Sequence, residues 1–203
     1  MGNAVLYLYN TKHTTIAQIA MTTESELEGV NVLHSLKPKD SGCYEGISIK
    51  ILKYCACIII KPLNHTLNCS LMSGICPNRC KFAIVRPIHK NGKLDELNNY
   101  RPISLLTAIY KILETLKYQK LLQHLETNNI LTPAQYGFRK VYHINDAIFN
   151  LVNNITNLLD QRKHVGRIFC DLNKASYCVN HETLLTKLHY HGVKGLCLSW
   201  FKS

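Results

Sequence analysis

One carboxylate in the sequence stands where it could bind a metal ion. Asp171 lies near the end of a short apolar run at 165–172, whose β-branched and aromatic members predict a buried strand. A carboxylate at the tip of such a strand is a natural ligand for a hard divalent cation. The alternative is a carboxylate that caps the turn after the strand, and the nearby Lys174 does not decide between the two.

A cluster of cations lies earlier in the chain. Residues 80–89 alternate between apolar and basic side chains, which predicts a strand, and Asn91-Gly92 is a hairpin turn signal with a return strand near 100–104. Between residues 79 and 101 there are six basic and two acidic residues: Arg79, Lys81, Arg86, Lys90, Lys93 and Arg101 against Asp95 and Glu96. Basic side chains on a two-stranded finger could clamp phosphates. A charged hairpin that is merely solvated remains the alternative.

The nine cysteines could suggest a metal site or disulfides. None forms a C-x-x-C pair, no histidine pair follows at zinc-finger spacing, and the number is odd. We therefore expect reduced thiols, most of them buried, in an intracellular protein of the cytoplasm or nucleus. A Cys/His zinc module stays open as an alternative, and a metal analysis of the purified protein would decide it.

The composition narrows the class of protein. The 24 Lys and Arg residues against 13 Asp and Glu give 24 − 13 = +11, and such a basic chain attracts polyanions, most commonly nucleic acid. Hydrophobic residues make up 46%, too many for a disordered chain. The longest strongly apolar run, 54–60, is far too short to span a bilayer, and the first residues do not resemble a secretory signal.

The elements that must position these side chains follow from periodicity and capping. We expect a helix opened by a capping box at Thr23 and Glu26, then two helical stretches within 47–71 broken near Pro62. A long helix should follow at 105–126. Asn145 or Asp146 should cap the next helix, whose apolar face is formed by Ile148, Leu151, Val152, Ile155 and Leu159.

The last predicted helix spans 180–190 and is closed by Gly192. Helices interleaved with few strands predict an α+β chain. If the strand at 165–172 lacks neighbours, Ile168 and Phe169 should be poorly buried, and we expect about 15 residues at the end of the chain to be loosely held.

Several segments, in order, resemble the reverse transcriptases of non-LTR (LINE-type, Jockey-like) retrotransposons. They are FAIVRPIHKNGK at 82–93, NNYRPISLL at 98–106, YKILETLKYQKLLQHLETNNIL at 110–131, AQYGFRK at 134–140, DAIFNLVN at 146–153 and GRIFCDLNKASYCVNHETLLTKLHYHGVKG at 166–195. The resemblance implies helix-rich fingers and an incomplete palm of a right-hand polymerase. It divides the chain into a leader at 1–22, a helical segment at 23–80, and fingers with partial palm at 81–203.

The resemblance also implies roles for individual residues. Asp171 would be the first palm carboxylate, holding Mg²⁺ with help from the Leu172 carbonyl, in a two-metal mechanism. Lys90 and Arg101 would hold the incoming deoxynucleoside triphosphate. The remaining nucleotide-binding positions would be Gln135, Gly137, Phe138, Arg139 and Ser176. The implied partners are an RNA template and a DNA primer; the oligomeric state is open.

The chain departs from the family pattern at two places. Ser176-Tyr177 stands where the family has Phe-Asp, and loss of the aromatic side chain would relax discrimination against ribonucleotides. The family's later aromatic-x-Asp-Asp block has no counterpart in the sequence, and Asp171 is its last aspartate. We therefore expect a fragment of an RNA-directed DNA polymerase that is inactive alone. The alternative is a basic remnant that binds RNA or DNA without catalysis.

Overall fold

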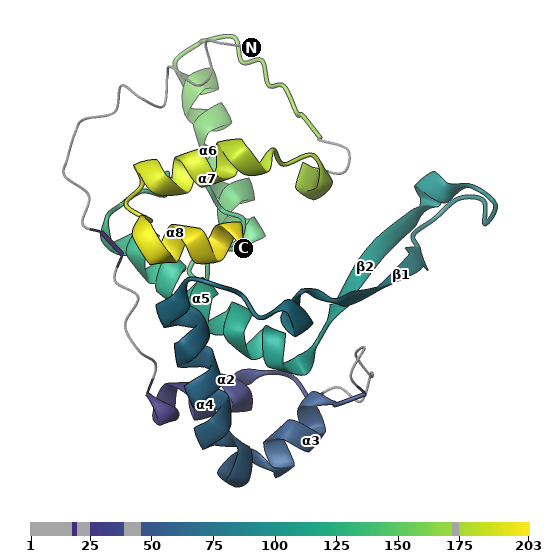
Figure 1. The fold of residues 1–203 in the computed structure, drawn as a ribbon. Coiled ribbons are helices and arrows are strands. Elements are labelled where there is room, and N and C mark those ends of the chain that lie inside the picture. Colours follow the sequence, from purple (N-terminus) through teal and green to yellow (C-terminus); the bar gives the residue numbers. More distant parts are fainter. Residues whose placement is uncertain (1–17, 20–24, 39–45, 172–174) are drawn as a thin grey trace.

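The computed structural model describes residues 18–19, 25–38, 46–171 and 175–203, and it shows a helical body from which one β-hairpin projects (Figure 1). The elements, with η marking 3₁₀ helices, are α2 (Glu26–Ser35), α3 (Ile49–Tyr54), α4 (Ala56–Ser73), η1 (Asn78–Lys81), β1 (Ala83–His89), η2 (Leu97–Asn99), β2 (Tyr100–Leu106), α5 (Ala108–Thr127), α6 (Ile144–Asp160), η3 (Ala175–Tyr177), α7 (His181–Tyr190) and α8 (Gly195–Lys202). Helices with one small sheet confirm the predicted α+β class.

The hydrophobic core lies among α2, α4, α5 and α8. Leu33, Leu71, Ile112 and Leu113 are almost completely buried in it, and Trp200 enters it from α8. The Trp200 indole Nε1–H donates a hydrogen bond to Ser70 Oγ on α4 at 3.0 Å. The expected looseness at the end of the chain is therefore wrong, because the apolar side chains of α8 have a core to enter.

The first two predicted helical regions exist, with different boundaries. A capping box does open α2, but it joins Ser25 and Glu28: Ser25 N–H donates to the Glu28 carboxylate at 2.8 Å, and Glu28 N–H donates to Ser25 Oγ at 3.2 Å. Thr23 lies outside the described residues. Later, α3 and α4 are separated at Cys55, whereas Pro62 lies inside α4, so the predicted break near Pro62 is wrong.

Burial explains why α4 continues past its proline. Pro62 removes one backbone donor, but Ile60 and Leu63 on either side of it are buried in the protein interior. The Pro62 carbonyl keeps a partner, since Thr66 Oγ1–H donates to it at 2.9 Å. The apolar contacts on both sides of Pro62 thus outweigh the lost hydrogen bond.

The hairpin, α5 and α7 confirm their predictions closely. β1 and β2 pair antiparallel from Ala83↔Leu106 to His89↔Tyr100. Thr107 caps α5 by accepting a hydrogen bond from Tyr110 N–H at 3.1 Å, three residues later than the predicted start because Leu105 and Leu106 belong to β2. Asn180 caps α7. Among the described residues, no helix is long and apolar enough to cross a membrane.

The predicted strand at 165–172 is wrong as far as the structure describes it. Residues 165–171 have no regular structure, and Leu172 lies outside the described residues. A strand needs a hydrogen-bonding neighbour, and the two strands found in the described part of the chain pair with each other. Ile168 and Phe169 are exposed, as expected for an apolar run without a covering layer.

Helix α6 is present, but its apolar face is not buried. Its first turn is closed by His143 N–H, which donates to the Asp146 carboxylate at 2.7 Å, so the helix begins slightly before the predicted caps. Ile148, Val152 and Leu159 remain exposed, and no residue of α6 is buried among the described part of the chain. The face predicted to pack is present in the sequence without a partner in the fold.

Candidate nucleotide-binding site

The β-hairpin places the two predicted triphosphate ligands on one face. Ile88 pairs with Arg101 in the strand register, and Lys90 follows Ile88 by two residues. Because side chains alternate along a strand and directly paired residues share a face, Lys90 and Arg101 lie diagonally on the same side. Arg86 lies on that side too, so one face of the exposed hairpin carries three cations.

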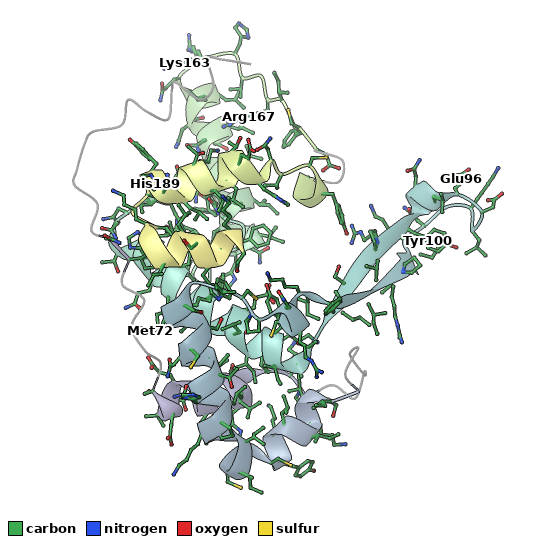
Figure 2. All side chains as sticks on the ribbon, viewed as in Figure 1. Met72, Glu96, Tyr100, Lys163, Arg167 and His189 are labelled. Carbon is green, nitrogen blue, oxygen red and sulfur yellow. The ribbon has the colours of Figure 1, made fainter. Side chains whose placement is uncertain are left out.

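The opposite face of the hairpin fixes its shape. Pro87 pairs with Pro102. Lys90 N–H donates to the Asn99 carbonyl at 2.8 Å, and hydrogen-bonded pairs alternate with non-hydrogen-bonded pairs along an antiparallel ladder. The two prolines therefore form a non-hydrogen-bonded pair, where their missing N–H groups are not needed. The rings of His89 and Tyr100 meet edge to face at 5.3 Å. Tyr100 O–H also donates to the Leu94 carbonyl at 2.8 Å, holding the loop near Glu96 (Figure 2).

The segment at 134–140 forms a turn held by its own polar groups. Gln135 Nε2–H donates to the Gly137 carbonyl at 3.2 Å, and Arg139 Nη1–H donates to the Thr132 carbonyl at 3.3 Å. The Arg139 guanidinium lies 4.2 Å from the ring centre of Tyr142. This arrangement gives Arg139 a fixed position at the base of the turn.

The tip of that turn is open to solvent. Phe138 has φ +62° and is 94% exposed. A non-glycine residue in this region of φ is uncommon. A Cβ at Gly137 would meet no atom within 4 Å, so packing within the described residues does not require glycine, and the backbone is free for an approaching ligand.

Asp171 is exposed, and fewer of the residues around it are described than around the hairpin. Leu172 lies outside the described residues, and Ser176 is in η3 with its side chain not described. Within the described residues, no hydrogen bond or ion pair links Asp171 to Lys90, Arg101 or the turn at 134–140.

One contact missed by sequence analysis joins the Asp171 region to the hairpin. Tyr177 O–H donates a hydrogen bond to the Pro102 carbonyl at 2.7 Å. Pro102 follows Arg101 directly in β2, so η3 is tied beside one of the two predicted triphosphate ligands. The signal in the sequence was Tyr177 itself, which replaces a short acidic side chain by a long one with a hydroxyl donor.

The residues that the structure describes do not form a two-metal site. The described part of the chain contains no group of three or more His, Cys, Asp or Glu side chains that could hold a metal ion. A single exposed carboxylate cannot supply the several oxygen ligands that divalent cations require. No zinc site of four Cys or His ligands is formed by the described residues either.

Comparison with known proteins agrees with the sequence motifs. The family model for reverse transcriptase (RNA-dependent DNA polymerase) matches residues 88–203. The probable RNA-directed DNA polymerase from transposon BS of Drosophila melanogaster is 30% identical over 173 residues, covering 82% of this chain and 19% of the relative. The RNA-directed DNA polymerase from mobile element jockey of the same species is 31% identical over 121 residues, 59% of this chain and 13% of the relative.

A more distant relative is the retrovirus-related Pol polyprotein from type-1 retrotransposable element R2 of Popillia japonica, 28% identical over 61% of this chain and 17% of the relative. The matched family region covers more than half of the chain, and the chain belongs to the reverse transcriptase family. Its relatives place it with non-LTR retrotransposons, which confirms the predicted resemblance. The chain spans about a fifth of the length of the curated relatives it matches.

Proposed function

We propose that this chain provides the fingers and the first part of the palm of an RNA-directed DNA polymerase. The observation that carries the proposal is the common face of Lys90 and Arg101 on a projecting hairpin, in a chain of the reverse transcriptase family. Two cations at fixed spacing suit a triphosphate, whose transfer depends on positioning and charge stabilisation. Gln135, Gly137, Phe138 and Arg139 would contact the nucleotide or template.

The proposed partners are an RNA template, a DNA primer and deoxynucleoside triphosphates. Asp171 would contribute one carboxylate toward Mg²⁺, the ion on which the family generally depends, and Ser176 would lie near the nucleotide sugar. We assign substrate binding to the nucleotide-binding residues named above. Because the described residues do not form a complete metal site, we expect no polymerisation from residues 1–203 alone. Primer extension on an RNA template is the direct measurement.

The binding part of the proposal is tested on an RNA–DNA hybrid. Replacing Lys90 and Arg101 by alanine should weaken binding, and the slope of log K against log salt should become shallower by about one for each cation that contacts a phosphate. Lys93→Ala, on the loop of the same hairpin, is the matched control and should change the slope less. If Lys90→Ala, Arg101→Ala and Lys93→Ala change the affinity and the salt slope equally, the assignment of Lys90 and Arg101 is wrong.

A basic module that binds nucleic acid without catalysis is the second candidate. The net charge of +11 and the exposed cationic hairpin face favour it. The two candidates differ in triphosphate binding: a polymerase part should bind a deoxynucleoside triphosphate more weakly after the Lys90 and Arg101 substitutions, whereas a binding module should show no triphosphate affinity that depends on them.

A further inference from the structure

A cavity of about 620 Å³ lies where the end of β2, the middle of α5 and the helix α8 meet. Its size falls within the range of about 300–1,000 Å³ that is typical of ligand sites. None of the predicted nucleotide-binding residues lines it. It is therefore distinct from the hairpin face that carries Lys90 and Arg101.

Four aromatic side chains line this α5–α8 pocket: Tyr110 and Tyr118 from α5, and Trp200 and Phe201 from α8. Trp200 is held by its hydrogen bond to Ser70 and meets the Phe201 ring edge to face at 5.6 Å. Tyr118 is half exposed at the opening. Trp200 is only 6% exposed, so the ring surface open to a ligand comes from Tyr118 and from the half-buried Tyr110 and Phe201.

Cations accompany the rings. Lys117 Nζ lies 5.5 Å from the ring centre of Trp200, and the exposed Lys81 lies on the rim. Burial raises the pKa of the Cys76 thiol on the pocket wall, and the Lys81 ammonium partly opposes that rise, which places this cation close to the wall. Glu114 is the acidic side chain in the lining, so lysines outnumber carboxylates there.

Tyr110 adds a hydrogen-bond donor inside the pocket. Burial, together with the Glu114 carboxylate, raises the pKa of its phenol above the ordinary value, so the hydroxyl keeps its proton at neutral pH. The lining therefore combines flat apolar surfaces, a neutral donor and positive charge. A purine or pyrimidine with an attached phosphate matches all three features.

We propose that the α5–α8 pocket binds one unstacked nucleotide of a single-stranded nucleic acid, with the base against the aromatic rings and the phosphate at Lys81. The proposal rests on the proposed function, because it assumes that this chain handles a nucleic-acid strand. It adds a second contact site for that strand at the base of the hairpin, on the α5 and α8 helices.

The chain carries its own reporter for this site, because Trp200 is its single tryptophan. A single-stranded oligoadenylate RNA of about ten nucleotides, within the site sizes of single-strand binders, is titrated into the 203-residue protein. Trp200 emission should change and saturate at the same concentration as the anisotropy of a labelled copy of the RNA. AMP is titrated in parallel, and a Trp200 response to AMP at similar concentrations would assign the pocket to free nucleotides.

Tyr118→Ala and Lys81→Ala should each weaken RNA binding about tenfold if a stacked base and its phosphate are lost. Tyr54→Ala on α3 and Lys61→Ala on α4 are matched controls, since both side chains are exposed and neither lines the pocket; these variants should bind as the unchanged protein does. Circular dichroism confirms that each variant is folded.

Two outcomes would overturn the pocket assignment. One is RNA binding by anisotropy with no change in Trp200 emission, and the other is an equal effect of Tyr118→Ala and Tyr54→Ala.

A double Lys90→Ala, Arg101→Ala variant separates the two proposals. If it loses hybrid and triphosphate binding while the pocket variants bind RNA normally, the pocket inference alone fails; if it changes nothing while the pocket variants lose RNA, the hairpin assignment alone fails.

Discussion

His191 is a half-buried residue whose charged form is disfavoured in the folded protein. Desolvation lowers its pKa below the ordinary 6.5, and Lys187 and His124 lower it further. The unfolded chain therefore binds a proton at this position more readily than the folded chain does. Its stabilising contribution is present above pH 6.5 and is lost as the pH falls through 6.5 toward the lower folded-state pKa.

His191→Gln should make the protein less sensitive to acid. Between about pH 7.5 and about pH 5.5, which bracket the ordinary histidine pKa, the midpoint of thermal unfolding should fall less in the variant than in the unchanged protein. The hydrogen bond from His124 Nε2–H goes to the backbone carbonyl of His191 at 2.7 Å, so the substitution can retain it. An equal fall in both proteins would show that His191 does not contribute.

Among the elements, η3 and β2 are joined by a contact between residues 75 positions apart in the sequence. A 2.7 Å hydrogen bond ties Tyr177 to the carbonyl of Pro102, next to Arg101. An exposed hydrogen bond of this kind contributes modestly to stability, about 1 kcal/mol, but it can restrict the motion of a projecting hairpin. Its loss should therefore show in local dynamics more than in global unfolding.

Tyr177→Phe removes only the hydroxyl that makes this bond. Amide hydrogen exchange in peptides that cover β1 and β2 should become faster, while exchange in α5 stays unchanged, because the hairpin loses a tether and the core does not. Tyr54→Phe, also an exposed tyrosine, is the control and should leave hairpin exchange as it is. Unaltered hairpin exchange in Tyr177→Phe would mean that the bond does not restrain β2.

The apolar face of α6 gives a second test at this scale. Val152 is 56% exposed, whereas Leu113 in α5 is 1% exposed. Val152→Lys should lower the free energy of unfolding by no more than about 0.5 kcal/mol, because little apolar contact is lost. Leu113→Ala should lower it by about 2–5 kcal/mol, because it opens a cavity in the core. Urea denaturation measures both, and comparable losses would show that the α6 face is covered.

For the whole molecule, the sequence predicted the elements that depend on short-range interactions, such as turns, strand alternation and helix caps. Turn residues and alternation located the hairpin, and helical periodicity with an Asn180 cap located α7. The break between α3 and α4, the run at 165–172 and the helix α8 depend on which surfaces meet in three dimensions, and periodicity within a short window contains no such information.

The candidate site divides in the same way. The diagonal placement of Lys90 and Arg101 on one face follows from the strand register, in which Arg101 pairs with Ile88, and a sequence can specify such a register. The position of Asp171 relative to the hairpin could not be predicted, because it depends on residues 163–171, which have no regular structure. The α5–α8 pocket was also invisible, since its aromatic residues come from helices about 80 residues apart along a chain that folds back on itself.

The bond between Trp200 and Ser70 joins residues 130 positions apart, and α4 packs against α8 around it. During synthesis, α2 to α4 leave the ribosome long before α8 is made, so the apolar surface of α4 that contacts α8 is not yet covered. Contacts between residues so far apart in the sequence slow folding and leave hydrophobic surface exposed to chaperones or to neighbouring nascent chains. For this molecule, the rate of translation and the supply of chaperones should influence the yield of native protein.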